Sequence, residues 1–564
     1  MYAILGGLAG GLVVLVWWAL FSRAAPLERW GAIALMAAGL AVTPWFLDKS
    51  IATGMMGMMF LLGAIPFVSL TLVAWAVTTH RLSSGPRLAA LAAALLAACG
   101  GWTLLRTDGL IGAGSQLAWR WTKTHEEQLL ARVGTEPLAP PPAPAKLETK
   151  EPTPRPAEAK SPVIASAVPA VRRVEPAAGA DWPGFRGPQR DSVIRGTRIK
   201  TDWANSPPVE LWRRPAGPGW SSFAVGNGLI YTQEQRGDFE FVACSRLATG
   251  EPVWAHRDAA RFWESNGGAG PRGTPTLSDG RVYTFGATGI LNALDAATGS
   301  AVWTRNVAAD TGAKIPGWGF SSSPVVVSGS VIVAASGHLA AYDLATGNPR
   351  WVVPAGGGSY SSPHVMTLDG VQQIVFLSGD GATSVAPGDG KVLWKHSWPG
   401  STILQPTLTA DGGVLITTGS YSGGVGTRRL AVAQGPSGWT VEERWTSIGL
   451  KPYFNDLVVH KGHAFGFDGA ILSCIGLEDG HRKWKGGRFG QGQLVLLADQ
   501  DLLLVLSEEG ELALVAATTD KFAEISRFRA IEGKTWNHPV LAGDILLVRN
   551  GQEMAAFRLP LASL

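Results

Sequence analysis

Apolar residues follow two contrasting patterns along the chain. Four long apolar stretches, near residues 3–21, 30–47, 55–79 and 88–105, each have the length that a helix needs to cross a bilayer core of about 30 Å. After residue 200, short apolar runs alternate with turns rich in Gly, Asp and Ser, which is typical of β-strands joined by hairpins. The pattern predicts a transmembrane region of four α-helices in residues 1–110, followed by an all-β region.

The β region is periodic. In most units a Trp follows an apolar strand and a Gly-containing turn, and successive Trp residues are 39 to 51 residues apart. This spacing is the period of four-stranded propeller blades. We expect each Trp to pack on a neighbouring blade rather than to stack on a ligand. The marker residues are Trp212, Trp254, Trp303, Trp351, Trp394, Trp445 and Trp484.

The two ends of the repeat region are incomplete in complementary ways. Residues 208–214 form a strand that precedes any complete unit, and the last unit, near Phe557, has only three strands. Phe528 stands where the seventh unit would end in Trp. We therefore expect an eight-bladed propeller over residues 181–564, closed by strand 208–214 in the last blade. Ring closure is favourable because it leaves only short, protected sheet edges.

Two segments connect the helices to the repeats. Residues 111–134 contain aromatic and charged positions that predict a juxtamembrane helix. Residues 135–180 consist largely of Pro, Ala, Lys and Glu. Such a segment buries too little apolar surface to offset its ordering entropy, so we expect a disordered, extended linker.

Composition and charge narrow the functional classes. A chain that is 46% hydrophobic and 16% charged is expected to lie partly in lipid. Residues 1–200 carry 20 Lys+Arg against 12 Asp+Glu, whereas residues 201–564 carry 28 against 32. The basic excess therefore belongs to the membrane flank and the linker. A nucleic-acid partner is not expected, because the large domain has no clustered basic face.

Charge also bears on orientation. The first and third loops between the apolar stretches carry four arginines, whereas the second loop carries only Lys49. Because positive loops tend to stay in the cytoplasm, this places both termini and the propeller on the other side of the membrane. Arg106, Arg120 and Lys123, just after the fourth stretch, favour the opposite orientation.

Catalytic motifs are scarce. The three cysteines, Cys99, Cys244 and Cys474, form no adjacent pair and no CxxC or CxxCH, so covalent haem and a thiol-ligated zinc site have no basis. We expect buried thiols and no metal site. HExxH, GxSxG, a P-loop and GxGxxG in a βαβ context are also absent, which leaves ordinary hydrolase and nucleotide chemistry unsupported.

Two sequence features resemble a known family. Leu294-Asp-Ala-Ala-Thr-Gly-Ser-Ala-Val-Trp and the matching segment that begins at Tyr342 resemble the pyrroloquinoline-quinone repeat. Asp181-Trp-Pro-Gly-Phe-Arg-Gly-Pro-Gln-Arg-Asp is similar to the beginning of the propeller in a bacterial, often membrane-attached subgroup. The resemblance implies an eight-bladed propeller. That fold is shared by quinoprotein alcohol dehydrogenases and by a non-catalytic propeller lipoprotein of outer-membrane protein assembly.

The same resemblance defines what an enzyme of this kind would need. Pyrroloquinoline quinone is bound there with calcium, typically through Glu and Asn ligands and an Asp base. The weak candidates for a base are Glu264 and Asp456. Asn455 and Asp456 offer suitable residue types, but neighbours on a strand point to opposite faces unless a bulge intervenes. The adjacent Cys pair of some of these enzymes is missing.

Binding candidates come from the starts of the inner strands, which face the channel, and from two unusual loops after residues 234 and 261. Arginines at these positions could bind a ligand carboxylate in bidentate fashion, and tryptophans could stack on a planar group of the ligand. An internal Arg–Glu network that holds the loops is the alternative, and His364 and His538 are expected mainly to form channel hydrogen bonds. The candidates are Arg236, Trp263, Arg272, Trp318, His364, Gln405, Asn455, Trp536, Asn537 and His538.

These features favour a membrane-anchored propeller that acts as a periplasmic binding or assembly platform for a protein partner or a small anionic ligand. The alternative is a quinoprotein dehydrogenase that uses pyrroloquinoline quinone and calcium and passes electrons to membrane quinone. A third hypothesis gives the activity to the helices and a sensing role to the propeller.

Overall fold

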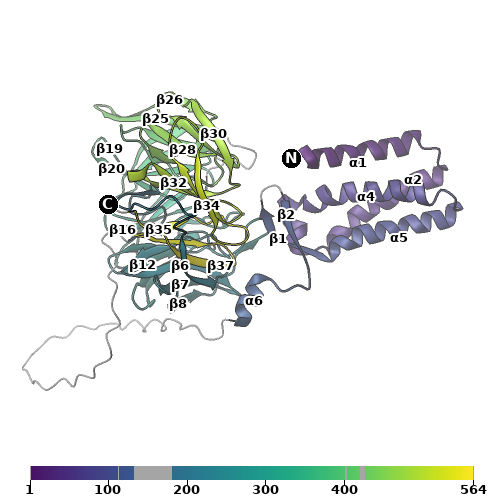
Figure 1. Cartoon of the computed structure of the whole chain (residues 1–564), viewed down its shortest axis with the longest axis horizontal. Helices are drawn as coiled ribbons and strands as arrows, with labels where there is room; N and C mark the ends of the chain where they lie inside the picture. The colour runs from purple at the N-terminus through teal and green to yellow at the C-terminus, as the bar shows by residue number, and fades with distance from the viewer. Residues whose placement is uncertain (1, 112–113, 133–180, 401–402, 419–425, 563–564) are drawn as a thin grey trace, which may run out of the picture.

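The computed structural model describes residues 2–111, 114–132, 181–400, 403–418 and 426–562 (Figure 1). A bundle of apolar helices extends from one side of a β-propeller. The linker expected at 135–180 lies outside the described residues. The helical elements are α1 (Tyr2–Phe21), α2 (Pro26–Val42), η1 (Thr43–Phe46), α3 (Lys49–Thr53), η2 (Gly54–Gly57), α4 (Met59–Thr78) and α5 (Ser84–Thr103).

Fewer helices qualify as membrane spans than the four expected. By length and composition, α4 and α5 are long and apolar enough to cross a membrane. A third span results if Pro26–Phe46 and Lys49–Gly57, which are bent by 116° relative to each other, count as one. The described side chains of α1, Gly6–Phe21, form a shorter apolar helix. The structure therefore supports two or three candidate spans among the described residues.

The third apolar stretch begins its long helix later than expected, at Met59 rather than near residue 55. Met55 and Met56 adopt left-handed backbone angles (φ +50° and +59°), which interrupt the helical path. Left-handed conformations are costly for residues other than glycine and persist where surrounding contacts impose them. One such contact joins the backbone N–H of Met55 to the Asn266 side-chain oxygen of the propeller at 3.2 Å.

The two ends of the helical bundle differ. At the end far from the propeller, Arg87 forms an ion pair with Glu28 at 2.6 Å, and Trp18 donates to the carbonyl of Arg29 at 3.2 Å. At the near end, Arg120 donates to the carbonyl of Thr103 at 3.0 Å (Figure 1). The arginine-rich loops therefore lie opposite the propeller.

The segment between the helices and the linker is mostly not helical. A hairpin of β1 (Leu105–Ile111) and β2 (Gly114–Trp119) precedes a short helix, α6 (His125–Arg132). The helix expected over residues 111–134 is confined to α6, because residues 114–119 form a strand that pairs with β1. Glu126 of α6 binds Arg261 of the propeller through two bonds of 2.7 and 2.9 Å. The hairpin and α6 thus join the helical bundle to the propeller.

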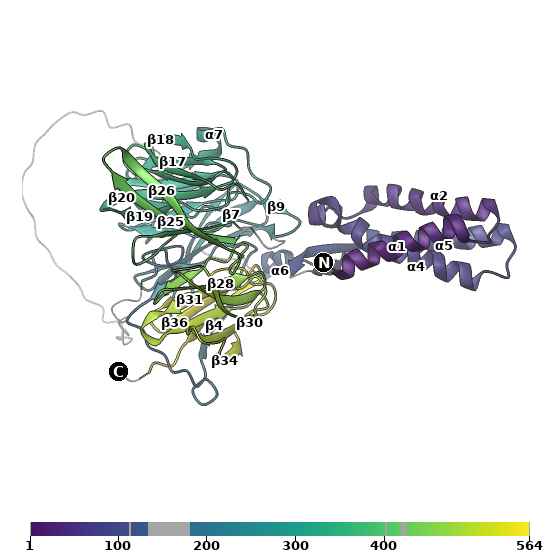
Figure 2. The same ribbon diagram turned by 90° about the horizontal axis from the view of Figure 1, so that it is seen from above.

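Eight sheets of mainly antiparallel strands form the blades, which confirms the predicted eight-bladed propeller; Figure 2 shows these sheets beside the helical bundle. The strands of blades one to four are β5 (Ala224–Gly226), β6 (Leu229–Arg236), β7 (Phe239–Arg246), β8 (Pro252–Asp258); β11 (Thr276–Ser278), β12 (Arg281–Phe285), β13 (Ile290–Asp295), β14 (Ala301–Asn306); β15 (Val325–Val327), β16 (Ser330–Ala335), β17 (His338–Asp343), β18 (Pro349–Pro354); and β19 (His364–Leu368), β20 (Val371–Ser378), β21 (Gly381–Val385), β22 (Val392–Ser397).

The strands of blades five to eight are β23 (Thr407–Leu408), β24 (Val414–Thr418), β25 (Gly426–Gly435), β26 (Gly438–Ser447); β27 (Val458–His460), β28 (His463–Asp468), β29 (Ile471–Gly476), β30 (Arg482–Arg488); β31 (Gln493–Leu497), β32 (Leu502–Leu506), β33 (Glu511–Ala516), β34 (Glu524–Arg529); and β35 (Val540–Ala542), β36 (Ile545–Arg549), β37 (Glu553–Arg558), β4 (Val209–Pro215). β4 is hydrogen-bonded to β37, with Trp212 opposite Ala556. β4, which precedes all the other blade strands in the sequence, therefore belongs to the last blade. A short hairpin of β9 (Trp263–Glu264) and β10 (Gly268–Ala269), the helix α7 (Val307–Thr311) and the turn η3 (Ala498–Gln500) lie outside the blades.

The recurrent Trp residues connect neighbouring blades. The indole N–H of Trp254 donates to the carbonyl of Ala296 in the next blade at 3.1 Å, and Trp303 contacts Leu344 in the same way at 3.2 Å. Each ring also covers the glycine of the neighbouring turn. A Cβ placed on Gly299 would lie 2.4 Å from the ring of Trp254, so only glycine leaves room for it.

We expect Gly299→Ala to lower the free energy of unfolding by about 2 to 4 kcal/mol, because it combines left-handed strain with a clash. Gly280→Ala is the matched control: Gly280 has a similar φ of +72°, but nothing lies within 4 Å of its added Cβ. Thermal unfolding of both full-length variants in detergent measures the difference. Equal loss in the two variants would show that backbone strain, not Trp docking, dominates.

Residues 181–200 run through the propeller rather than around it. The backbone of Trp182 exchanges two hydrogen bonds with Val225 of the first blade, at 2.9 and 2.7 Å. Arg190 donates to the carbonyl of Pro324 in the third blade at 3.0 Å. β3 (Val193–Ile194) then adds in parallel to β31 of the seventh blade. We call residues 182–194 the channel plug, because they contact inner strands on several sides of the axis.

Candidate functional site

A cavity of about 430 Å³ lies at the mouth of the propeller channel, on the side of the helices. Every blade contributes to it at or near the start of its inner strand. Its walls are largely aromatic, and Phe185 of the channel plug also lines it. The aromatic wall residues from the blades are Trp220, Trp318, Tyr360, Tyr453, Phe454 and Trp536. We call this space the mouth cavity.

Residues from the helical region also line the mouth cavity. Met55, Met56 and Met58 come from the interrupted segment before α4, Leu62 from α4 itself, and Leu110 from the β1–β2 hairpin. Thioether side chains pack adaptably against aromatic rings. The propeller and the helical bundle therefore complete one apolar site that neither provides alone.

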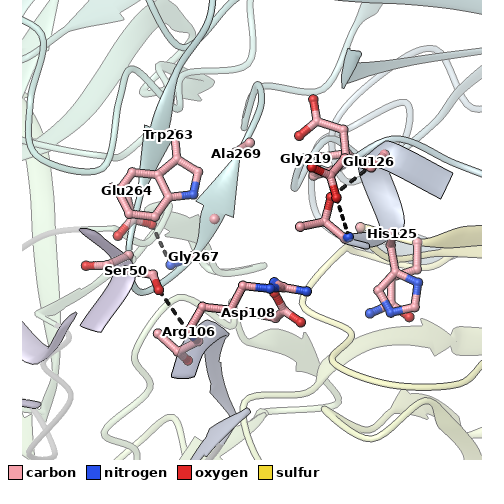
Figure 3. A pocket seen from close by; sticks show the side chains of 18 of the residues that line it. Ser50, Arg106, Asp108, His125, Glu126, Gly219, Trp263, Glu264, Gly267 and Ala269 are labelled. Carbon is pink, nitrogen blue, oxygen red and sulfur yellow. Dashed lines mark hydrogen bonds and ion pairs between the residues drawn. The ribbon is translucent and has the colours of Figure 1, made fainter. Parts of the chain in front are cut away.

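A second cavity of about 820 Å³ adjoins the first and shares Trp220, Glu264 and Gly267 with it. We call it the polar cavity, because charged side chains line it (Figure 3). Figure 3 shows Ser50 of α3 and Arg106 and Asp108 of β1 together with Trp263 and Glu264 of the propeller. The ammonium of Lys49 lies 5.2 Å from the centre of the Trp263 ring, which is within the range of a cation–π contact.

Glu264 separates the two cavities and is fully engaged. Its carboxylate accepts backbone N–H groups from Asn266 and Gly267 at 2.7 and 2.5 Å, and it pairs with Arg272 at 3.3 Å. Arg272 also donates to the carbonyl oxygens of Gly268 and Gly270. The predicted candidates Glu264 and Arg272 thus both lie at the site, where their described contacts stabilise the β9–β10 loop.

Asp456 lies at the floor of the mouth cavity beside the channel plug. Its carboxylate accepts the backbone N–H of Gln405 at 2.7 Å and lies 3.8 Å from the guanidinium of Arg186. Burial raises the pKa of Asp456, although Arg186 and Arg190 act in the opposite direction. Gln405 also lines the cavity, and its side-chain oxygen accepts the N–H of Ser362 at 2.9 Å.

The last blade brings three polar groups to the site. Trp536 donates its indole N–H to Glu508 at 2.9 Å. The ammonium of Lys534 lies 4.5 Å from the Trp536 ring centre and 5.1 Å from that of Trp220. Burial lowers the pKa of Lys534 to about 8. His538 is buried, with its Nε2 2.9 Å from the Ser192 hydroxyl of the channel plug.

Four of the predicted candidates do not line either cavity. Arg236 is buried in an ion pair with Glu234 at 2.5 Å. His364, Asn455 and Asn537 are buried in the surrounding packing. Asn537, for example, donates to the carbonyls of Gly219 and Ser221. The alternative of an internal Arg–Glu network therefore describes what Arg236 does in the structure.

Several residues that line the cavities are not among the ten predicted binding candidates. Tyr453 and Phe454 immediately precede Asn455 and follow the same strand-start rule, so that rule could have found them. Lys534 precedes Trp536 and could have been found in the same way. Met55 and Leu110 could not, because they lie in the helical region and nothing in their local pattern indicates the propeller.

His538 makes the stability of the propeller dependent on pH. Burial, with Arg186 nearby, lowers the pKa of His538 to about 3. The unfolded chain protonates this histidine below its ordinary pKa of about 6.5, whereas the folded chain keeps it neutral until the pH approaches 3. Its contribution to stability is therefore complete above pH 6.5 and falls as the pH is lowered.

We expect wild-type protein to lose about 2 to 3 kcal/mol more stability than the His538→Gln variant between pH 7 and pH 4.5. Denaturant unfolding of the full chain in detergent at both pH values measures this difference. His481→Gln is the control, because His481 is exposed. Parallel pH profiles for wild type and His538→Gln would contradict the assignment.

The described residues do not fit the cation of a quinoprotein dehydrogenase. Such a cation needs converging carboxylate or amide oxygens, but Glu264 and Asp456 are each held by backbone N–H groups and an arginine. No three His, Cys, Asp or Glu side chains of the described residues gather closely enough to hold a metal ion. Cys244 and Cys474 lie in different blades as free, buried thiols.

The fold and the repeats together define an eight-bladed propeller built from pyrroloquinoline-quinone-type repeats. A family model described as "Outer membrane protein assembly factor BamB" matches residues 208–355 and 238–486. The chain therefore belongs to the pyrroloquinoline-quinone-repeat family of β-propellers.

Comparison with individual proteins gives more distant matches. The outer membrane protein assembly factor BamB of Burkholderia pseudomallei (strain K96243) is 28% identical over 197 residues, which is 33% of this chain and 45% of that protein. The chain thus aligns with less than half of this relative's length. BamB from Moraxella catarrhalis has 15% identity over 63% of this chain and 99% of its own, with a TM-score of 0.46. Quinohemoprotein alcohol dehydrogenase from Comamonas testosteroni has 13% identity, coverage of 70% and 82%, and a TM-score of 0.47.

Proposed function

We propose that the protein is a membrane-anchored binding and assembly platform whose propeller lies outside the cytoplasm and docks a protein partner. One observation carries this proposal. The acids at the channel mouth are held by backbone N–H groups and arginines, so their described contacts are structural ones. A rigid scaffold whose acids are already paired suits binding better than catalysis.

The distribution of arginines supports the orientation. Ion pairs and hydrogen bonds of Arg29 and Arg87 lie at the end of the helices that is far from the propeller. If that end faces the cytoplasm, as positive loops tend to do, the propeller lies on the other side of the membrane. In this proposal α1 and α2 also cross the membrane, which gives four spans in total. The membrane is the bacterial inner membrane.

The names of the relatives agree with a platform. The matching protein of Burkholderia pseudomallei is named an assembly factor of outer membrane proteins. We propose that this chain, too, is a propeller that takes part in the assembly of other proteins.

Photo-crosslinking in intact membranes tests the platform. A benzoylphenylalanine at Asp279 or Ser328, both exposed turns at the far ends of inner strands, is expected to capture one protein of defined mass. The same probe at Trp318, in the mouth cavity, is the matched control and is expected not to capture it. Equal capture from both positions, or none from the far face, would contradict the proposed docking face.

The dehydrogenase remains the second candidate, because Asp456 is a buried acid with a raised pKa that lines a cavity. Purified full-length protein is mixed with pyrroloquinoline quinone and calcium, and the quinone absorbance of the washed protein is recorded. The platform predicts no retained cofactor. Stoichiometric uptake that the Asp456→Asn variant abolishes would overturn it in favour of the enzyme.

A further inference from the structure

The two adjoining cavities have opposite polarity and lie where the helical bundle contacts the propeller. The mouth cavity is apolar and is lined partly by Met58 and by Leu62, which belongs to the first turn of α4. α4 is long and apolar enough to cross a membrane. A hydrocarbon chain in the surrounding bilayer would therefore meet this cavity at the end of a span, without passing through water.

The polar cavity has the charges that a zwitterionic headgroup requires. Lys49 and Lys534 line it, and Glu264 and Glu508 lie close enough to Lys534 to oppose the lowering of its pKa by burial. Both ammonium groups also lie over Trp rings. Asp238 supplies a nearby negative charge for an ammonium group. Lysine ammonium groups bind phosphate oxygens through charge-assisted hydrogen bonds.

Unused hydrogen-bonding capacity in the mouth cavity also indicates a missing occupant. The side chain of Gln491 lines this cavity and is about nine-tenths buried, and its carbonyl oxygen has no partner. Buried polar atoms are usually satisfied, so such an atom calls for an explanation. A glycerol hydroxyl or an amide of a bound molecule would supply the missing donor.

Asn266 joins the elements that border both cavities. Its backbone carbonyl accepts the N–H of Leu110 and the ammonium of Lys534, both at 3.2 Å, and its side chain accepts the N–H of Met55. The helical segment, the hairpin and the last blade therefore meet at one residue. This arrangement fixes the position of the boundary between the polar and apolar spaces.

We propose that the paired cavities bind one zwitterionic phospholipid, with a hydrocarbon chain in the mouth cavity and the phosphate at Lys534 and Lys49 in the polar cavity. The lipid would complete the contact between the helical bundle and the propeller. This inference rests on the membrane anchoring in the proposed function, but it does not depend on the identity of the protein partner.

Full-length protein in vesicles of phosphatidylethanolamine that carries a diazirine on one chain tests the proposal. After irradiation, we expect labels on peptides that contain Tyr453, Trp318 or Met56 and retention of about one phospholipid per chain after purification. Ser321→Phe, which fills the mouth cavity, is expected to abolish these labels. Labels confined to the outward side of α4, for example at Leu70, would overturn the proposal.

The headgroup is tested separately from the chain. Lys534→Met is expected to weaken binding of the phospholipid about tenfold, as the loss of one charge-assisted hydrogen bond predicts, and to leave binding of a diacylglycerol with the same chains unchanged. Lys314→Met, at an exposed position on the same face, is the matched control. Equal weakening for both lipids, or for both variants, would overturn the role of Lys534.

Failure of the anchoring and failure of the lipid site give different results. Wild-type protein that does not float with vesicles in a density gradient refutes the anchoring. Protein that floats but carries no label in the mouth cavity refutes the lipid site alone.

Discussion

Replacement of Arg186 with methionine is expected to lower the free energy of unfolding by about 3 to 5 kcal/mol. Arg186 is 1% exposed within the channel plug, where it donates to the carbonyl of Leu457 at 2.8 Å and to the hydroxyl of Ser192 at 2.8 Å. It also lies 3.8 Å from Asp456. Methionine fills a similar volume but leaves the buried carboxylate of Asp456 without its nearest cation.

Denaturant unfolding of the full-length chain in detergent measures this loss. Arg195→Met is the matched control, because Arg195 pairs with Asp191 at 3.9 Å but has a side chain that is 61% exposed. An exposed pair contributes less than about 1 kcal/mol. The double variant Arg186→Met, Asp456→Asn should regain part of the stability. If the double variant is as unstable as the single one, the carboxylate is not the cause.

The second large effect is expected at the junction between the last and first blades. Glu234 of β6 is 1% exposed and lies between Arg236 at 2.5 Å and Arg549 of β36 at 3.9 Å. Arg549 also donates to the carbonyl oxygens of Gln233 and Gly217 at 3.0 Å. Glu234→Gln leaves two buried guanidinium groups without their shared anion, and we expect a loss of about 3 to 5 kcal/mol.

This loss depends on pH. Burial raises the pKa of Glu234, but Arg236 and Arg549 outweigh it and hold the pKa below its ordinary value. The carboxylate therefore stabilises the fold fully above the unfolded pKa of about 4.3, and its contribution falls as the pH is lowered through the folded pKa. Unfolding of wild type and Glu234→Gln should differ strongly at pH 7 and less at pH 3.5.

Glu251→Gln serves as the control for this prediction. Glu251 belongs to the same blade but its side chain is 62% exposed, and it lies 4.0 Å from Arg246. A loss at position 251 as large as that at position 234 would mean that charge in general, rather than the buried junction, decides stability.

The blades could be predicted from sequence because one physical requirement recurs in most units. A Trp on an outer strand needs a glycine turn on the next blade, as Trp254 and Gly299 show, and this leaves a regular trace in the sequence. The helical region leaves no comparable trace. Left-handed Met55 and Met56 depend on a contact with Asn266, more than 200 residues away, so hydropathy alone misplaced the start of α4.

The site could be predicted only in part for the same reason. Trp318, Gln405, Trp536 and His538 meet at the mouth cavity because all inner strands start there, which is a property of the fold. Arg236 follows no such rule. Its guanidinium pairs with Glu234, two residues earlier on its own strand. The sequence alone does not distinguish this internal ion pair from an arginine that binds a ligand.

The channel plug has a consequence for biosynthesis. Ser192 contacts His538 across 346 residues, and Arg549 contacts Thr232 across 317 residues. The ribosome makes the plug and β4 long before the blades that enclose them exist. Such distant pairings slow folding, and an unpaired strand such as β4 invites mispairing while it waits. The emerging polypeptide should therefore depend on protection by chaperones until β36 and β37 have been synthesised.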